Sequence, residues 1–340
     1  MKNLNECINK LFSDNLCSNI AIKVGLREKT VYELYKSENS TINETTLFDI
    51  ASVTKIVCTT TLALIAIDKK LLSPSDKVSK YFFVPNGKED LSVLNLLTHT
   101  MGIGYKLLSD YTDTPDNIAD AILNIPLDFP IGDDVRYSCP AFILLGKILE
   151  IVLDDKLDCL LAKYVSTPLE MSSTRFLPET SVNIVNANIN PSECGTVNDL
   201  NCRFLGGVSG NAGVFSNIRD LSKYAEMLLN KGAPIISENT FTKATVNFTE
   251  NKSESRGLGF LMVDERYNQT GNLFSNGSFG HCGHTGQSLF VDPQSGLYVI
   301  ILSDMTLSTI KKFGVDTYGE VILARENIHN SILKDLGYFL

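Results

Sequence analysis

Tryptophan is absent from this 340-residue chain, histidine occurs only four times, and the eight cysteines include no Cys-x-x-C pair. Few histidines and scattered cysteines provide neither a zinc-binding pattern nor a disulfide framework, so we expect no metal and no cofactor. Basic clusters are also lacking: 30 Lys and Arg stand against 39 Asp and Glu, giving a net charge of −9. We therefore expect neither nucleic acid nor a membrane as a partner.

Residues 1–19 lack the uninterrupted hydrophobic run of a secretory signal. Charged residues at Lys2, Glu6, Lys10 and Asp14 interrupt the apolar ones, which predicts an amphipathic helix. We expect a cytoplasmic protein, in which the cysteines stay reduced and act mainly as small buried hydrophobic residues.

The composition is that of a globular protein, with 44% hydrophobic and 20% charged residues. The length favours two lobes over one core. Strand-like patterns occur near both ends of the chain, and helical patterns alternate with loops between them. This order predicts one sheet built from both ends, with a helical insertion. The predicted strands are 19–27, 30–37, 257–263, 287–292 and 296–302; the predicted helices are 1–19, 92–98, 115–124, 140–152, 220–230 and 320–336.

The segment 50–67 contains a single charged residue, Lys55. Its length suits a membrane span, but Ser52, Lys55 and several threonines make it too polar, so we interpret it as a buried core helix. Ser52 lies three residues before Lys55 and on the same helical face. A buried lysine with a lowered pKa can accept a serine proton near neutral pH. The segment therefore offers a candidate nucleophile with its activating base.

A structural interpretation of the same residues is that Ser52 caps the helix and Lys55 extends to solvent. The pattern Ser-x-x-Lys also recurs at Ser308 and Lys311, where a loop-like stretch predicts a solvated surface. The pattern alone does not decide between catalysis and capping.

Two later motifs add candidates. Tyr137 follows a turn and precedes an apolar helix; it can be core filler, but beside Lys55 and another cation its pKa would fall below ~10 and it could act as a general base. The segment 280–287, Gly-His-Cys-Gly-His-Thr-Gly-Gln, opens a strand, and its glycines allow close backbone approach. The backbone N–H of Gln287, with that of Ser52, could form an oxyanion hole.

The order Ser-x-x-Lys, Tyr-Ser-x, His-Thr-Gly resembles the β-lactamase and penicillin-binding-protein family of serine hydrolases, and most closely the class C β-lactamases with their related esterases and peptidases. The similarity extends to four further stretches, at residues 46–55, 96–102, 168–171 and 210–216. The resemblance implies an α+β sandwich in which helices flank an antiparallel sheet. The α/β part would span about 1–50 and 205–340, and an inserted helical subdomain about 51–204.

The resemblance also implies roles for individual residues. Ser52 is the nucleophile, Lys55 its activator and Tyr137 the general base. Ser52 and Gln287 form the oxyanion hole. The substrate-binding positions are Cys139, His284, Thr285 and Gly286. His99 carries no catalytic role, and we interpret it as a structural residue that satisfies nearby backbone groups.

Two departures from the family pattern affect the expected substrate. Cys139 stands where the family usually has Asn, and a thiol is a weak donor and a poor acceptor. His284 replaces a lysine, exchanging a permanent cation for one only partly charged at neutral pH. Both changes favour hydrolysis of a small ester or amide over efficient β-lactam hydrolysis.

Three hypotheses follow from the sequence. The first is a serine hydrolase that forms an acyl-enzyme on Ser52 with a small-molecule acyl substrate. The second is a penicillin-binding protein, β-lactamase or D-Ala peptidase. The third, suggested by Cys139, is a catalytically degenerate binding protein.

Overall fold

The main sheet joins strands from both ends of the chain. The computed structural model describes residues 1–27, 29–179, 183–264, 266 and 269–337. Six strands pair in the order β2-β1-β10-β9-β8-β7, and every pairing is antiparallel. This confirms the predicted sheet. Its strands are β1 (Asn19–Leu26), β2 (Lys29–Ser37), β7 (Leu261–Met262), β8 (Phe279–Cys282), β9 (Ser288–Asp292) and β10 (Leu297–Ser303).

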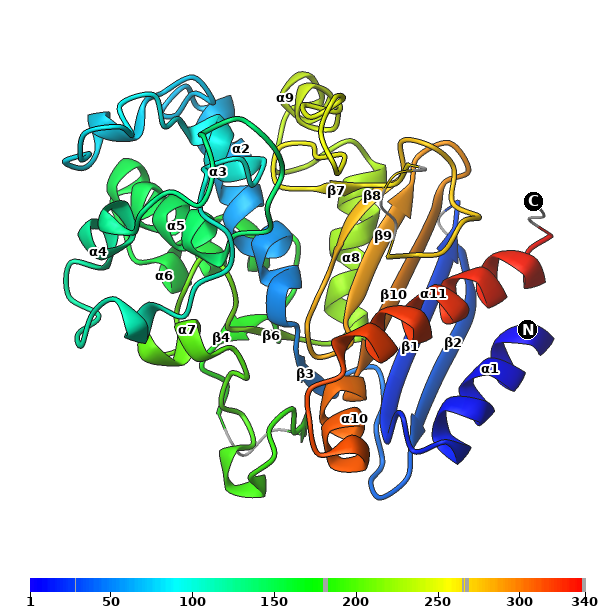
Figure 1. Cartoon of the computed structure of the whole chain (residues 1–340). Helices are drawn as coiled ribbons and strands as arrows, with labels where there is room; N and C mark the ends of the chain where they lie inside the picture. The colour runs from blue at the N-terminus through cyan, green and yellow to red at the C-terminus, as the bar shows by residue number, and fades with distance from the viewer. Residues whose placement is uncertain (28, 180–182, 265, 267–268, 338–340) are drawn as a thin grey trace.

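Helices cover both faces of this sheet (Figure 1). On one face lie α1 (Lys2–Ser13) and α11 (Tyr318–Asp335); on the other lies α8 (Ile218–Leu229). The seven residues of β10 are all buried, because its alternate side chains enter two different hydrophobic cores. The predicted N-terminal helix is confirmed, with its apolar stripe at Leu4, Ile8 and Leu11 turned inward.

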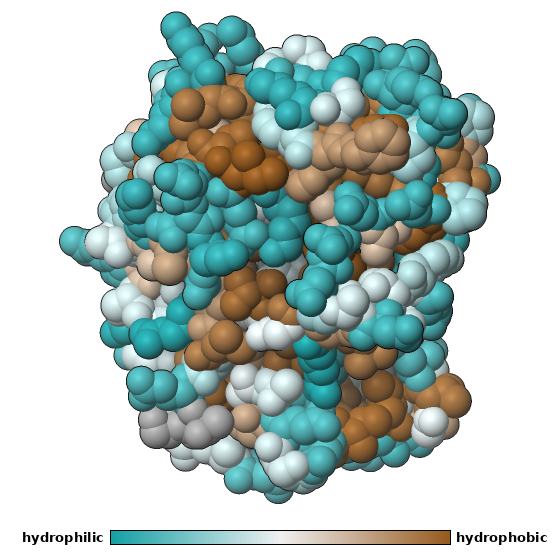
Figure 2. Space-filling model, turned by 90° about the vertical axis from the view of Figure 1, so that its left-hand side faces the viewer, coloured by the Kyte–Doolittle hydropathy of each residue, from teal (hydrophilic) through white to brown (hydrophobic). Residues whose placement is uncertain are grey.

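A group of helices beside the sheet forms the rest of the molecule (Figure 1). The face that this group presents in Figure 2 mixes apolar patches with hydrophilic side chains. The longest of its helices, α5, is apolar on most sides and buried at 11 of its positions, as expected of a core helix. The helices are α2 (Thr61–Asp68), α3 (Val93–Leu97), α4 (Ile118–Asn124), α5 (Cys139–Leu153), α6 (Leu157–Leu161) and α7 (Leu200–Phe204); two more, α9 (Glu238–Ala244) and α10 (Met305–Phe313), lie elsewhere.

The segment Ala51–Asp68 passes through the middle of the protein. By length and composition it could span a bilayer, but 83% of it is buried within the protein, as in the core helix of a globular fold. It begins with a 3₁₀ turn (Ala51–Val53), continues as a π-helix (Lys55–Thr60) and ends as α2. The hydroxyls of Thr61 and Tyr224 each donate to the Ile56 carbonyl at 2.8 Å. They provide hydrogen-bond donors for this backbone acceptor within the π-helix.

A second, smaller sheet was not predicted. Its strands β4 (Arg175–Phe176), β5 (Ile184–Val185), β3 (Leu47–Asp49) and β6 (Val214–Ser216) pair in the order β4-β6-β3-β5. Strands of two or three residues leave no readable alternation in a sequence. The pairing of Asp49 with Phe215 joins the segment before Ser52 to the glycine-rich loop 210–213. This small sheet therefore assembles two parts of the candidate site.

Two sequence-based expectations are corrected. The Ser-x-x-Lys pattern at Ser308 and Lys311 lies on helix α10. Ser308 is only 5% exposed and contacts Asp304, so the prediction of a solvated loop was wrong for this serine. Lys311 is exposed. The predicted strand 257–263 shortens to β7, because Gly259, with φ of +80°, turns the chain against Thr60.

Candidate active site

Ser52 sits on the tight 3₁₀ turn between β3 and the central helix. Ala51, just before it, adopts a left-handed φ of 47°, and its N–H donates to the Asp49 carboxylate at 2.8 Å. Burial raises the pKa of Asp49 to about 6, although N–H donors from Asn198 and Ala51 oppose this shift. The buried carboxyl thus fixes the turn that presents the serine.

Three predicted residues meet at the Ser52 hydroxyl. The Lys55 Nζ donates to the Ser52 Oγ at 3.0 Å, and the Tyr137 hydroxyl lies 2.5 Å from the same oxygen. Tyr137 comes from the segment just before α5, 85 residues away in sequence. A hydroxyl between an amine and a phenol is the arrangement that an activated serine nucleophile needs.

Lys55 is completely buried. Its Nζ also donates to the Asn211 carbonyl at 2.8 Å and contacts the Cys139 Sγ at 3.8 Å. Burial lowers the pKa of Lys55, and the effects of Cys139 and Asp199 only partly oppose it. The structural interpretation in which Lys55 extends to solvent is therefore wrong.

Sequence reasoning missed Asn211 as a site residue, although it quoted the Gly-Asn-Ala-Gly stretch. The Asn211 amide donates to the Asp199 carboxylate at 3.0 Å and accepts from the Ser209 hydroxyl at 2.7 Å. Asp199 in turn caps α7 by accepting from the Cys202 N–H at 2.8 Å. These contacts fix the position of the Asn211 carbonyl, which orients Lys55. Because the acceptor is a backbone atom, the residue type does not reveal this role in the sequence.

The environment of Tyr137 differs from the sequence-based expectation. Its ring lies between His99, with centroids 5.0 Å apart, and His281, with centroids 6.2 Å apart. Burial raises the pKa of Tyr137 well above its ordinary value. The expected lowering of this pKa by neighbouring cations is thus wrong, because burial of the phenol is the largest influence on it. At neutral pH the phenol keeps its proton.

His99 holds the backbone around Tyr137. Its Nδ1 accepts from the Ser138 N–H at 3.1 Å, and its carbonyl accepts from the Arg136 N–H at 2.9 Å. The interpretation of His99 as a structural residue is confirmed by these bonds.

The segment 280–287 contacts the nucleophile turn through Gly283 and Gln287. A Cβ on Gly283 would lie 2.9 Å from the Ile50 carbonyl, so only glycine fits. The Gln287 Nε2 donates to the carbonyls of Asp49 at 2.8 Å and Ser303 at 3.0 Å. The buried Thr285 hydroxyl also donates to Asp49, at 3.2 Å, and Gly286 packs against Ser303. The side chain of Gln287 thus braces the strand that leads to Ser52.

The two histidines of this segment have different surroundings. His284 is half-buried, pairs with Asp316 at 3.0 Å and stacks on Tyr318. His281 is buried beside Tyr137, and its Nδ1 donates to the Cys282 carbonyl at 2.7 Å. Burial lowers the pKa of His281 well below its usual range, so the imidazole is neutral at neutral pH. The sequence alone does not distinguish His281 from His284, because a glycine follows each of them two positions later.

Cys139 lies at the N-terminus of α5 with its thiol against Lys55. Burial raises the pKa of the Cys139 thiol, so it stays protonated and is no competing nucleophile. Among the described residues, no group of three or more His, Cys, Asp or Glu side chains is placed to hold a metal ion.

Comparison with known proteins agrees with this geometry. The Beta-lactamase family model matches residues 8–309. The chain belongs to the Beta-lactamase family. It is 30% identical over 307 residues to the "Putative D-alanyl-D-alanine carboxypeptidase" of Escherichia coli (strain K12), across 78% of this chain and 70% of the relative. It is 24% identical over 340 residues to the N-acetylmuramyl-L-alanine amidase of Bacillus subtilis (strain 168), across 82% and 75%.

Solved structures of this fold superpose along nearly the whole chain. EstCE1, described as a hydrolase with promiscuous acyltransferase activity, has a TM-score of 0.79 at 19% identity, covering 98% of both chains. The chain is thus a β-lactamase-fold member of a serine hydrolase family that includes peptidase, esterase and acyltransferase neighbours.

Proposed function

We propose that this protein is a serine hydrolase that cleaves a small ester or amide through an acyl-enzyme on Ser52. The observation that carries the proposal is the contact of one hydroxyl with both Lys55, at 3.0 Å, and Tyr137, at 2.5 Å. Family membership supports a hydrolytic activity.

The reaction uses the two contacts in turn. The neutral amine of Lys55 takes the Ser52 proton, and the Oγ attacks the substrate carbonyl carbon. The N–H groups of Ser52 and Gln287 donate to the resulting oxyanion. The Tyr137 hydroxyl then gives its proton to the leaving group and takes another from Lys55. This protonation releases the alcohol or amine and leaves acyl-Ser52. Water then attacks this ester by the same steps in reverse order.

The surroundings of the serine favour esters and simple amides over β-lactams. Cys139 provides no amide to hold a substrate carbonyl beside Lys55. His284 is half-buried and pairs with Asp316, and an imidazole is not a permanent cation. The second candidate function is D-alanyl peptidase activity, which the printed name of the E. coli relative favours.

The decisive experiment is labelling with a fluorophosphonate probe, read by intact mass. We expect one adduct on the wild type and none on Ser52→Ala. Ser308→Ala is the matched control, because Ser308 belongs to another Ser-x-x-Lys pattern of the chain; it should label like the wild type. An unlabelled wild type would favour a binding protein without turnover. Nitrocefin, p-nitrophenyl esters and D-Ala-D-Ala peptides then rank the substrate classes, and rapid nitrocefin hydrolysis would reverse our order.

We further propose that the protein works in the cytoplasm on a diffusible acyl compound, with neither nucleic acid nor a membrane as partner. Its eight cysteines are all free thiols, several of them buried, which suits a reducing compartment. Fractionation of the source cells tests this: recovery of the protein from the membrane or external fraction would contradict it.

A further inference from the structure

Arg256 is a buried arginine in the segment between α9 and β7, and it is only 3% exposed. Its backbone is fixed on both sides: its N–H donates to the Thr249 hydroxyl at 2.8 Å, and its carbonyl accepts from the Phe248 N–H at 2.8 Å. Burying a guanidinium in this way is costly unless its charge and its N–H donors find partners.

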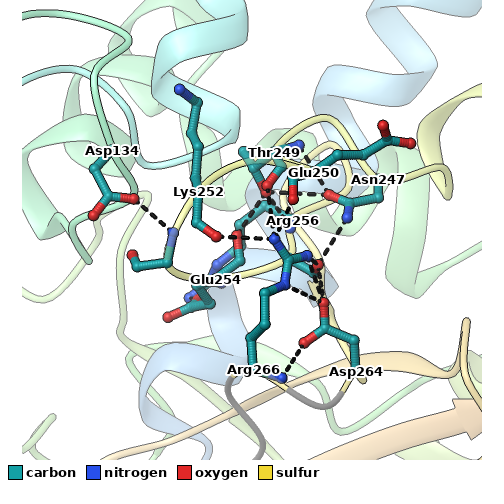
Figure 3. A network of polar contacts seen from close by, with 11 residues as sticks. Asp134, Asn247, Thr249, Glu250, Lys252, Glu254, Arg256, Asp264 and Arg266 are labelled. Atoms are coloured by element: carbon teal, nitrogen blue, oxygen red, sulfur yellow. Dashed lines mark hydrogen bonds and ion pairs between the residues drawn. The ribbon is translucent and has the colours of Figure 1, made fainter.

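The guanidinium is only partly satisfied. Its Nη2 forms an ion pair with Glu254, but Nε and Nη1 are buried and have no hydrogen-bond partner among the residues that the structure describes. An unpaired buried donor costs about 1–3 kcal/mol. Arg266, which follows β7, is the contrasting case: it binds the Asp264 carboxylate and the Lys252 carbonyl, the latter at 2.9 Å (Figure 3).

The position of Arg256 links it to the catalytic groups. It bridges to Leu261, which pairs in β7 with Gly280, the residue before His281. Three residues after Arg256, the Gly259 N–H donates to the Leu97 carbonyl, two residues before His99. Arg256 therefore lies on a turn between the two elements that flank Tyr137.

Electrostatics agree with this placement. Burial is the largest cause that lowers the pKa values of Lys55, His99 and His281, and the positive charge of Arg256 lowers each of them further. The guanidinium is thus within electrostatic range of all three groups. Both histidines are neutral at neutral pH, so they do not supply a positive charge for a substrate.

The loop that carries Arg256 is held firmly against the Tyr137 segment. The Lys252 Nζ donates to the Asp133 carbonyl at 2.9 Å. The Ser253 N–H donates to the Asp134 carboxylate at 2.7 Å (Figure 3). A donor on such a braced loop is preorganised for a ligand.

We propose that the free N–H groups of Arg256 bind an anionic group, a carboxylate, on the substrate of Ser52, so that the protein prefers anionic esters or amides to neutral ones. This inference rests on the proposed function. Arg256 then supplies the fixed cation that His284 does not, and the substrate carboxylate satisfies donors that are otherwise unpaired.

The test uses ester pairs that differ only in charge. In one pair, 3-carboxyphenyl acetate and 3-carbamoylphenyl acetate, the charge is on the leaving group; in the other, 4-nitrophenyl glutarate and 4-nitrophenyl glutaramate, it is on the acyl group. We expect the wild type to prefer the anionic member of at least one pair by tenfold or more in kcat/KM. Arg256→Gln should lose that preference, mainly through a higher KM for the anionic ester. Because the charge of Arg256 also lowers the pKa of Lys55, the variant changes the rate of both esters, and the ratio of their two kcat/KM values is the readout. Arg136→Gln, an exposed arginine on the adjoining segment, is the control and should keep the preference.

A second measurement needs no variant. Benzoate should protect the wild type from fluorophosphonate labelling at concentrations where benzamide does not. Absence of a charge preference in both pairs, an equal loss on both esters in Arg256→Gln, or equal protection by the two ligands would overturn the assignment of Arg256 while leaving the serine mechanism standing. If no ester acylates the wild type, the proposed function itself fails.

Discussion

The Tyr137 hydroxyl lies 2.5 Å from the Ser52 Oγ, in a setting where burial raises the pKa of the phenol well above its ordinary value. A phenol in this state cannot be the resting base. In the proposed mechanism the proton acceptor is therefore the amine of Lys55, whose pKa is lowered by burial. In that mechanism Tyr137 is a protonated group that carries a proton between Lys55 and the leaving group.

Tyr137→Phe tests this division of roles. The ring is kept, with its packing against His99, and only the hydroxyl is lost. We expect kcat for an ester to fall by about 10²–10⁴, the range for loss of a general acid or base, with little change in KM. Steady-state kinetics measure it, and thermal unfolding checks the fold. A variant as active as the wild type would exclude Tyr137 from proton transfer.

The pH dependence of kcat/KM should follow Lys55. In the proposed mechanism the reactive form is the neutral amine, so kcat/KM rises as pH increases through the pKa of Lys55. Because burial lowers this pKa, the rising limb of the pH profile should lie below the pH range of an ordinary lysine. Since the negative charge of Asp199 raises that pKa, Asp199→Asn should move the limb to lower pH. Asp90→Asn, on the exposed surface, is the control. An unchanged pH profile in Asp199→Asn would show that Asp199 does not influence the pKa of Lys55.

Cys139→Asn supplies the amide that the family usually has beside the lysine. The Asn oxygen can accept from Lys55 in place of the thiol contact at 3.8 Å, and its N–H₂ can donate to a substrate carbonyl. We expect acylation by nitrocefin to rise roughly tenfold, as one additional hydrogen bond of about 1.4 kcal/mol predicts. Stopped-flow absorbance measures it. Cys139→Ala should show no gain; an equal gain in both variants would assign the effect to the loss of the thiol.

His329→Gln tests a pH-dependent part of stability away from the site. His329 is buried, hydrogen-bonded to Ser288 at 2.8 Å, and burial lowers its pKa to about 3. Because the unfolded imidazole binds a proton near pH 6.5, the stability linked to this group is complete above that pH and is lost as pH falls towards 3. Between pH 7 and 5 this loss is about 2 kcal/mol.

Urea unfolding of both proteins at the two pH values measures the difference. The wild type should lose about 2 kcal/mol more than His329→Gln over this interval, because the glutamine does not titrate. The same loss in both proteins would show that His329 does not contribute to acid sensitivity.

Local sequence patterns predicted the elements that are long and regular. The strands β1, β2, β9 and β10 and the helices α1, α5, α8 and α11 lie where alternation and helical periodicity placed them. The small sheet was missed, because its two- and three-residue strands form only through pairing with distant segments. The burial of Ser308 also depended on a segment that is remote in sequence, around the start of β1: the Ser18 hydroxyl lies 3.2 Å from the Ser308 hydroxyl, and the Asn19 N–H donates to Asp304 at 2.9 Å.

The sequence by itself determined that the side chains of Ser52 and Lys55 lie close together in the core, since they stand one helical turn apart within an apolar run. Only the tertiary structure decided what surrounds the pair. It raised rather than lowered the pKa of Tyr137, brought the Asn211 carbonyl to Lys55, and placed His281 beside the ring of Tyr137. Spacing along one helix is a local property, whereas desolvation and backbone contacts between distant segments exist only once the chain has folded.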